Sequence, residues 1–531
     1  MRVFLSIRTR FVLACTVGAF LPDCARATLL VGIGQNFIGS TFGQDSSLLP
    51  PDPNGAVGPN HFVELINGRF TVYNKTNGVR VRTMTGLSFL SNAGVNVPNN
   101  WLVTDPRLIY DPSAQRWLAL QVDYDPSGAV TTNRFLLAIS ATSDPTGSWK
   151  GVALPGDING LDFADFPTLG LDAQNVYLSA DLFDSSQNPI GPTLVSLPKA
   201  DLLAGTPSIA HRTSFGTLTY SARGEILQPV VAVDGSSRGS VLAIAGLTGT
   251  VPQTTLKVSS IFNTVSPGPA LLSPATTIPV DSYSVPINPP QPDGTSNLDD
   301  GDARFSSFVY RVNGVLFAVH GTQMNTRAAL RWYRIDATNY VVLESGTITD
   351  PNLDLFYPSI AANTNNVIVI GCNGSSSNTF VSAYAVAGET VNGVTTFGKL
   401  LLLKPGVTSF QNPDRTGTSR WGDYSTTCVD PANPDHFWTI QMYPSGPDAW
   451  STQVTELLTS RFKLTITRTN ANVLICWPSL AKGFQLQTTS TLSPSSSWSA
   501  VAQARFTNGT QTCVLLPAFS AERFFRLRAA P

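Results

Sequence analysis

The sequence predicts an all-β protein, with a seven-bladed β-propeller followed by a small β-sandwich domain. Between about Asp52 and Ser460 the apolar residues form short, often alternating runs rich in Val, Ile, Phe, Tyr and Thr, without sustained helical periodicity. Gly (42) and Pro (38) are frequent among the 531 residues, which indicates many turns. A polar or Pro-containing opener, followed by an apolar strand and a turn, recurs seven times.

The first residues, Met1–Ala27, read as a secretory signal peptide. Arg2, Arg8 and Arg10 precede the apolar run Phe11–Leu21, and Ala25-Arg26-Ala27 fits a cleavage site. A membrane anchor is the alternative, but this run is shorter than the roughly 20 residues that a span needs. We therefore expect a secreted protein, extracellular or at the cell surface, with no membrane span in the mature chain.

The charge balance excludes one class of partner. Removing the signal takes away four Arg and one Asp, which leaves 30 basic and 34 acidic residues and moves the net charge from −1 to −4. Nucleic-acid binding needs a basic face, so we expect no nucleic-acid partner. Only 13% of the residues are charged, whereas soluble proteins average about 25%.

Short strands and tight turns alternate along the first 460 residues. Asn-Gly pairs at 67, 77, 313 and 392 are strong turn signals between strands. The clearest strands are Phe62–Ile66, Phe70–Tyr73, Trp117–Val122, Phe135–Ser140, Val176–Ala180, Val241–Ala245, Val315–His320 and Val367–Gly371. Leu197–Leu203 is a candidate helical turn.

The openers give the repeat its length. With residues 53, 106, 167, 229, 305, 358 and 424 as anchors, successive spacings are 53, 61, 62, 76, 53 and 66. A four-stranded blade cannot bury both faces alone, whereas radially stacked blades cover one another. We expect the propeller to span residues 28–461, with 28–43, and chiefly the apolar Leu29–Phe37, supplying the outer strand of the last blade. The widest spacing holds Val265–Asp299, which we expect to be a Pro-rich loop, either a spacer or a flap over one face.

Residues 462–531 read as a separate small β-sandwich. Four Cys remain after the signal, namely Cys372, Cys428, Cys476 and Cys513. Proximity in the sequence favours the pairs Cys372–Cys428 and Cys476–Cys513, with buried free thiols as the alternative.

Five stretches, in this order, carry a resemblance to a known group of proteins. They are Ser143–Trp149, Asp302–Arg304 with Val309–Gly314, Arg331–Asp336, Phe356–Ala361 and Arg420–Tyr424. Together they resemble a group of secreted bacterial seven-bladed β-propeller proteins, most of them uncharacterised, from about Pro51 to Glu456. The C-terminal unit is similar to a short β domain at the C-termini of exported bacterial proteins. The resemblance implies a fold and brings no known catalytic residue.

The openers also suggest a site. In a propeller, loops that enter the innermost strands lie on one face, so the openers should bring their polar residues to one channel mouth. Asp162 and Glu225 are expected there as well. The binding candidates are Asp105, Arg107, Asp165, Asp302, Arg304, Tyr357, Arg420, Asp423 and Tyr424.

We expect this mouth to bind an extracellular glycan or protein without catalysis. The alternative is a sialidase-like glycoside hydrolase or lyase, because Arg grips carboxylates and a Tyr beside a carboxylate is a possible nucleophile. Against it, the Asp-box repeats typical of sialidases are absent, and close Asp–Arg pairs are more often structural.

Metal and cofactor signals are weak. The acidic run Asp293–Asp302 has oxygen ligands for Ca²⁺ but does not match an EF-hand loop, and a solvated acidic loop is the simpler interpretation. The four His (61, 211, 320 and 436) lack metal-ligand spacing. We expect no cofactor, with Ca²⁺ as the one alternative.

Overall fold

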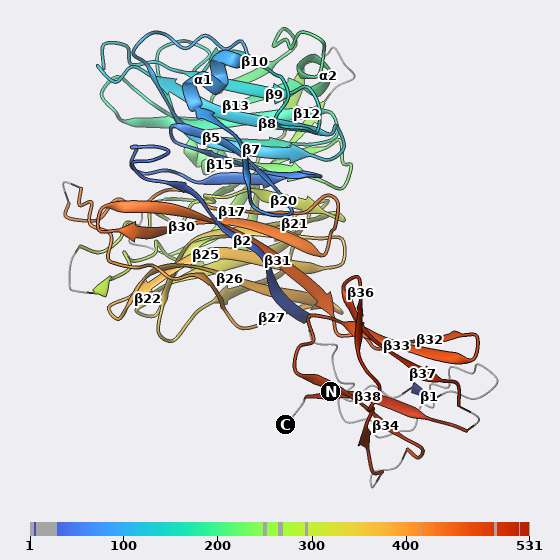
Figure 1. Ribbon diagram of the computed structural model, residues 1–531. Helices are drawn as coiled ribbons and strands as arrows, with labels where there is room; N and C mark the ends of the chain where they lie inside the picture. The colour runs from blue at the N-terminus through green and yellow to red at the C-terminus, as the bar shows by residue number, and fades with distance from the viewer. Residues whose placement is uncertain are drawn as a thin grey trace. The chain divides into compact units, whose positions relative to one another are not determined.

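The computed structural model describes residues 5–6, 29–247, 252–263, 269–292, 296–414, 416–492, 496–519 and 521–529 (Figure 1). Strands dominate these residues, and the helices α1 (Gly86–Asn92), α2 (Lys199–Leu202) and α3 (Tyr220–Arg223) are short. Within the described ranges, no helix has the length and apolar character needed to cross a membrane. The chain divides into two compact units, Ile33–Leu457 and a second that contains the strands from Leu458 onward together with residues up to Gly32.

Over the described residues, the strands of the larger unit divide into seven antiparallel groups, and parallel pairing at Leu171–Val231 and at Val230–Val309 joins the third, fourth and fifth groups into one 13-stranded sheet. The first three groups are β3 (Asn54–Val57), β4 (His61–Ile66), β5 (Arg69–Asn74), β6 (Arg80–Thr85); β7 (Leu102–Asp111), β8 (Arg116–Tyr124), β9 (Arg134–Ser140), β10 (Trp149–Pro155); and β11 (Phe163–Leu171), β12 (Asn175–Phe183), β13 (Pro189–Pro198), β14 (Thr213–Thr217). The next two are β15 (Glu225–Ala232), β16 (Gly239–Ile244), β17 (Gln253–Asn263), with β18 (Ala270–Leu272) and β19 (Thr276–Tyr283); and β20 (Val309–Val312), β21 (Val315–Met324), β22 (Arg327–Asp336), β23 (Val342–Ile348). The last two are β24 (Asp354–Ala362), β25 (Val367–Ser376), β26 (Thr379–Val391), with β27 (Val394–Phe397) and β28 (Leu401–Lys404); and β29 (Thr426–Val429), β30 (His436–Gly446), β31 (Ala449–Arg461), β2 (Leu29–Thr41).

The seventh group combines strands from opposite ends of the unit. Its order is β2-β31-β30-β29, so β2 forms the edge beside β31, as the blue and orange ribbons of Figure 1 show. Glu64 on β4 of the first group is fully buried and holds β2 and β31 through hydrogen bonds. Its carboxylate accepts hydrogen bonds from Ser40 Oγ (2.8 Å), Tyr73 OH (2.7 Å) and Thr452 Oγ1.

Hydrophobic cores lie between successive groups. Phe70 and Leu136 share one core of the first and second groups, and Leu120 and Leu178 share one of the second and third. The same holds along the chain to the sixth and seventh groups, which share a core that contains Phe356 and Met442. The last group packs on the first as well, because Phe62 of β4 stacks on Trp438 of β30 with ring centroids 5.6 Å apart.

The segment Val265–Asp299 differs from its expectation. Residues 264–268 and 293–295 lie outside the described residues, but β18 and β19 fall within the segment, and β19 pairs with β17. Pro279 on β19 is compatible with a strand because, among the described strands, β19 pairs with β17 alone, so that no second neighbour needs the missing N–H. Pro289–Pro292 lies outside strands, as expected from its composition.

The smaller unit has two described sheets around one core. They are β32 (Thr465–Thr469), β33 (Asn472–Pro478), β37 (Gln511–Pro517), β36 (Phe506–Asn508); and β1 (Leu5–Ser6), β38 (Phe524–Ala529), β34 (Phe484–Thr489), β35 (Ser499–Ala500). Trp477 and Phe525 belong to the shared core. Cys476 and Cys513 face each other on β33 and β37 and form a disulfide, as expected.

The pairing Cys372–Cys428 was wrong. Both thiols are free and buried. Cys372 lies on β25 in the core between the fifth and sixth groups, whereas Cys428 lies on β29 in the core between the seventh and first groups. Proximity in the sequence therefore did not correspond to a shared core, and the alternative of buried free thiols holds for this pair.

Candidate functional site

A cavity of about 490 Å³ lies where the first strands of several groups begin. Its wall is acidic, with seven aspartates and two arginines. The aspartates are Asp52, Asp105, Asp165, Asp299, Asp300, Asp302 and Asp423, and the arginines are Arg304 and Arg420. Tyr124, Phe163, Phe166 and Tyr357 add aromatic surface.

Bulges in the first strands present side chains to this cavity. The register of β7 shifts between Thr104 and Arg107, and β11, β15 and β24 have equivalent shifts at their own openers. A residue with positive φ lies in each bulge: Asp105 (56°), Phe166 (54°), Ile226 (48°) and Tyr357 (44°). Asp52 (48°), just before β3, has the same conformation. Asp52, Asp105, Phe166 and Tyr357 all precede Pro and line the cavity, so a strained backbone supplies four of its wall residues.

The two arginines of the wall are held by aspartates. Arg304 donates to Asp302 through Nε (2.8 Å) and Nη2 (2.6 Å). Arg420 donates to both oxygens of Asp423 at 2.7 Å and to Asp299 at 2.9 Å. Burial alone would lower the pKa of each guanidinium, but the carboxylates raise both pKa values above normal. Burial alone would raise the pKa of Asp423. The ion pair with Arg420 has the larger effect and leaves the pKa of Asp423 below normal.

Arg107 and Tyr424 lie beneath the wall. The Arg107 guanidinium carbon is 3.7 Å from the centroid of the Tyr424 ring, and both side chains are buried. Arg107 donates to the carbonyls of Pro167 (2.8 Å) and Ser306 (2.7 Å), while its Nη2 has no partner among the described residues. Burial lowers the pKa of Arg107. Arg107 is not among the residues that line the cavity.

Four wall carboxylates have no ion-pair partner among the described residues: Asp52, Asp105, Asp165 and Asp300. Asp52 accepts from the amide of Asp423 (2.9 Å) and from Asn67 Nδ2 (2.8 Å). Asp105 accepts from Thr104 Oγ1 (3.0 Å) and the amide of Phe166 (3.2 Å). Burial, followed by repulsion from Asp165 and Asp423, raises the pKa of Asp105 to about 7. Burial also raises the pKa of Asp52, which is repelled by Asp423 and Asp105.

Asp165 is the most accessible of these carboxylates because it faces the open cavity. Restricted hydration in the cavity nevertheless raises its pKa, although Arg304 and Arg420 act against this shift from a distance. Two further polar atoms on the wall are buried without a partner in the described part of the chain, the Tyr357 hydroxyl and Asp300 Oδ2. Burial and the charge of Asp299 raise the pKa of Asp300. Unsatisfied acceptors and donors in a concave site are groups that a ligand can satisfy.

Most predicted candidates meet at the cavity, and some do not. Asp105, Asp165, Asp302, Arg304, Tyr357, Arg420 and Asp423 line it, whereas Arg107 and Tyr424 lie below. Asp162 and Glu225 are not among the lining residues. Sequence reasoning missed Asp52, Asp299 and Asp300 as site residues. Asp52 has the same Asp-Pro opener signal as Asp105. Asp299 and Asp300 belong to the acidic run interpreted as a solvated loop, with Ca²⁺ binding as the alternative, and residues 293–295 of that run lie outside the described residues.

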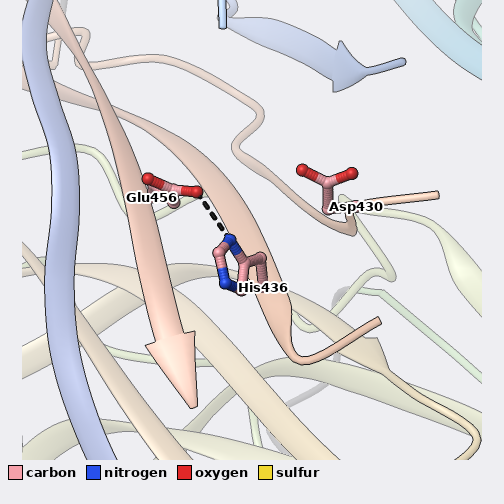
Figure 2. A group of neighbouring side chains, drawn as sticks. All are labelled: Asp430, His436 and Glu456. Atoms are coloured by element: carbon pink, nitrogen blue, oxygen red, sulfur yellow. Dashed lines mark hydrogen bonds and ion pairs between the residues drawn. The ribbon is translucent and has the colours of Figure 1, made fainter. Parts of the chain in front are cut away.

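A second polar group, Asp430, His436 and Glu456, has candidate metal-ligand atoms within 4.8 Å of one another (Figure 2). His436 Nδ1 is 2.8 Å from Glu456 Oε1, and the other Glu456 oxygen accepts from the amide of Gln35 at 2.9 Å. Asp430 pairs with Lys75 at 3.0 Å and accepts from the amide of Ala432 at 2.8 Å. Lys75 thus already neutralises Asp430, and the contacts join β2, β30 and β31, which makes this group a structural network.

No protein-family model and no curated protein matches the chain. The secreted bacterial group expected from the sequence therefore has no support from relatives, and that membership stays a prediction.

Solved structures with a similar arrangement of strands are propeller-like proteins. Drosophila Semaphorin 1b, extracellular domains 1–2, has a TM-score of 0.37 and 7% identity over 81% of this chain and 87% of that chain. A mutant of Trypanosoma rangeli sialidase displaying trans-sialidase activity has a TM-score of 0.34 and 8% identity over 81% of this chain and 91% of that chain. The exo-β-1,3-galactanase from Phanerochaete chrysosporium has a TM-score of 0.30 and 12% identity over 80% of this chain and 100% of that chain. At such scores and identities these likenesses carry no argument about function.

Proposed function

We propose that the protein is a seven-bladed β-propeller that binds a glycan in the acidic cavity without cleaving it. Support for the fold comes from the seven antiparallel groups, the cores between successive groups and the packing of Phe62 on Trp438, which joins the first group to the last. In this arrangement the cavity is the mouth of the central channel. The Cys476–Cys513 disulfide is compatible with the extracellular location predicted from the N-terminal signal.

The observation that carries the proposal is the set of unpaired carboxylates, Asp52, Asp105 and Asp165, on a cavity of about 490 Å³. Carboxylate oxygens accept hydrogen bonds from sugar hydroxyls, and hydrogen bonds to charged groups are the stronger ones. The cavity volume is typical of sites for small ligands or single sugar units, whereas protein partners usually need a broad and flatter surface. Phe163 and Tyr124, which are half-buried on the wall, offer aromatic surface against which a sugar ring packs.

Binding is tested with the chain from Thr28 onward on a glycan array, followed by titration calorimetry. We expect binding to at least one glycan class, and Asp165→Asn should weaken it at least about tenfold because a charged acceptor is lost. Asp448→Asn is the matched control, since Asp448 is exposed in the turn between β30 and β31 and does not line the cavity. Absence of binding across the array would refute the proposal.

A glycoside hydrolase is the second candidate, supported by one observation. Asp105 has a pKa of about 7, whereas the pKa of nearby Asp423 is below normal, and such a split is typical of an acid paired with an ionised carboxylate. A sialidase-like grip on a substrate carboxylate is less compatible, because Arg304 and Arg420 are engaged with aspartates. Turnover of nitrophenyl glycosides that disappears in Asp105→Asn, with the fold retained, would favour the enzyme over the binding protein.

A further inference from the structure

We infer that the sugar unit entering the cavity carries a protonated amine, so that the ligand is an amino sugar with a free amino group. This inference rests on the proposed glycan binding and adds the substrate class. The wall has seven aspartates against two arginines, and it stays acidic when Arg107 beneath it is counted. A neutral sugar needs acceptors, but it does not need this excess of negative charge.

The ion pairs of the two arginines leave four of the seven wall aspartates without a positive partner. Arg304 balances Asp302, and Arg420 lies between Asp423 and Asp299. Asp52, Asp105, Asp165 and Asp300 form no ion pair among the described residues. Carboxylates removed from water are costly unless they are paired, and the raised pKa values of these four groups reflect that cost. A cation bound in the cavity favours their ionised forms and so lowers the free energy of the site.

The hydrogen-bonding groups on the wall suit an ammonium group. Asp300 Oδ2 and the Tyr357 hydroxyl are buried, with exposed residue fractions of 3% and 6%, and neither has a partner in the described part of the chain. Asp165 faces the same cavity without an ion pair. An ammonium has three N–H donors and no acceptor, which matches a wall of free acceptors better than a hydroxyl does.

The spacing of the carboxylates favours an organic cation over a metal ion. Within the described residues, the only trio of His, Cys, Asp or Glu with ligand atoms in mutual reach is Asp430, His436 and Glu456, away from this cavity. Asp52, Asp105, Asp165 and Asp423 come from four separate openers, and Asp299, Asp300 and Asp302 come from one further stretch, so the wall aspartates are contributed by five parts of the chain. A sugar ring with an amine and several hydroxyls contacts distributed groups, whereas Ca²⁺ needs several oxygens at one point.

The experiment compares two oligosaccharides that differ only at nitrogen. Titration calorimetry at low salt and about pH 6 measures binding of glucosamine hexamer and of N-acetylglucosamine hexamer to the chain from Thr28 onward. We expect the free amine to bind at least about tenfold more tightly, with a preference that weakens as salt is added. Asp165→Asn should remove that preference, and Asp448→Asn should retain it.

A second variant guards against misfolding. Tyr357→Phe removes only the unpartnered hydroxyl, so we expect unchanged or higher thermal stability together with a several-fold loss of affinity for glucosamine hexamer. Equal affinity for the two hexamers, or array binding to other glycans alone, would overturn the amine inference and leave glycan binding standing. Failure of the whole array would overturn both. Tighter Asp165-dependent binding of Ca²⁺ or of an oligolysine peptide would also overturn the amino-sugar assignment.

Discussion

Asp105→Asn should stabilise the protein at alkaline pH, although it alters a buried residue of the cavity. Asn has the shape of a protonated Asp and tolerates the positive φ of 56° at this position. Its carbonyl oxygen can accept from the amide of Phe166, and its NH₂ group can donate to Thr104 Oγ1, so both existing contacts have a replacement. The variant therefore removes a charge and little else.

The size of the effect follows from the pKa of Asp105. That pKa is about 7 in the folded protein and 3.8 without the fold, so the folded state binds this proton more tightly. The resulting stabilisation is complete below about pH 4 and is lost as the pH rises through 7. About three pKa units correspond to about 4 kcal/mol. Asp165 and Asp423 ionise more readily once the charge is gone, so we expect Asp105→Asn to gain about 2 to 4 kcal/mol at pH 8 and almost nothing at pH 4.

Urea denaturation followed by tryptophan fluorescence measures this gain at pH 4, 6 and 8. Seven of the nine tryptophans lie in Ile33–Leu457, so the signal reports the unit that contains the cavity. Asp423→Asn is the matched control of opposite sign, because Asp423 is ionised and pairs with Arg420 at 2.7 Å. An Asp105→Asn variant that is less stable than the wild type at pH 8 would refute the reasoning and would mean that Arg107 depends on this carboxylate.

Three further predictions concern the stability of the fold. Glu64→Ala should lower the free energy of unfolding by about 3 to 5 kcal/mol in urea titrations, because three buried hydroxyl donors lose their acceptor. A loss below about 1 kcal/mol would mean that the contact of Glu64 with β2 and β31 does not unfold cooperatively with the rest of the unit. Gly170→Ala should cost about 1 to 3 kcal/mol in the same assay, because an added Cβ would lie 2.6 Å from the backbone of Pro229; a neutral result would show that β11 and β15 separate easily. Replacing Cys476 and Cys513 with Ser should destabilise the smaller unit by about 3 to 4 kcal/mol, since the disulfide closes 37 residues, and reductant should lower the melting temperature of the wild type but not of the variant.

Much of the strand pattern could be predicted because each repeat has a recognisable local residue pattern. The Asp-Pro and Tyr-Pro openers mark places where the chain bends before a buried strand, and these residues form the bulges of β7 and β24. Leu29–Phe37 forms part of β2, and β2 occupies the edge position beside β31 that was expected for this segment. The strand β19 was missed because the whole segment Val265–Asp299 was interpreted as a loop from its Pro content, above all Pro289–Pro292. Pro279 on β19 is compatible with a sheet because of the edge position of that strand.

The site was only partly predictable, because pairing between distant openers leaves no local signal. Arg107 and Arg304 occur in similar sequence contexts, yet Arg304 meets Asp302 at the cavity whereas Arg107 turns under Tyr424. The pairing of Cys372 with Cys428 was wrongly predicted for the same reason, because the distance between two residues in the sequence does not show which core each strand faces. The acidic excess of the wall also required the structure, because it depends on which charges find partners.

The residues with positive φ at the openers line the cavity, and the strands that follow them form the sheets. At positions 52, 105, 166 and 357 the side chain enters the cavity, while the strand that follows keeps its hydrogen-bond ladder. At positions 52 and 105, a residue that tolerates positive φ, as Asn and Gly do, changes the surface offered to a ligand and leaves the strand ladder in place. Phe166 and Tyr357 also belong to hydrophobic cores, so a change there affects packing as well. Positions 52 and 105 are therefore the two at which a laboratory library could alter the charge of the cavity on the same scaffold.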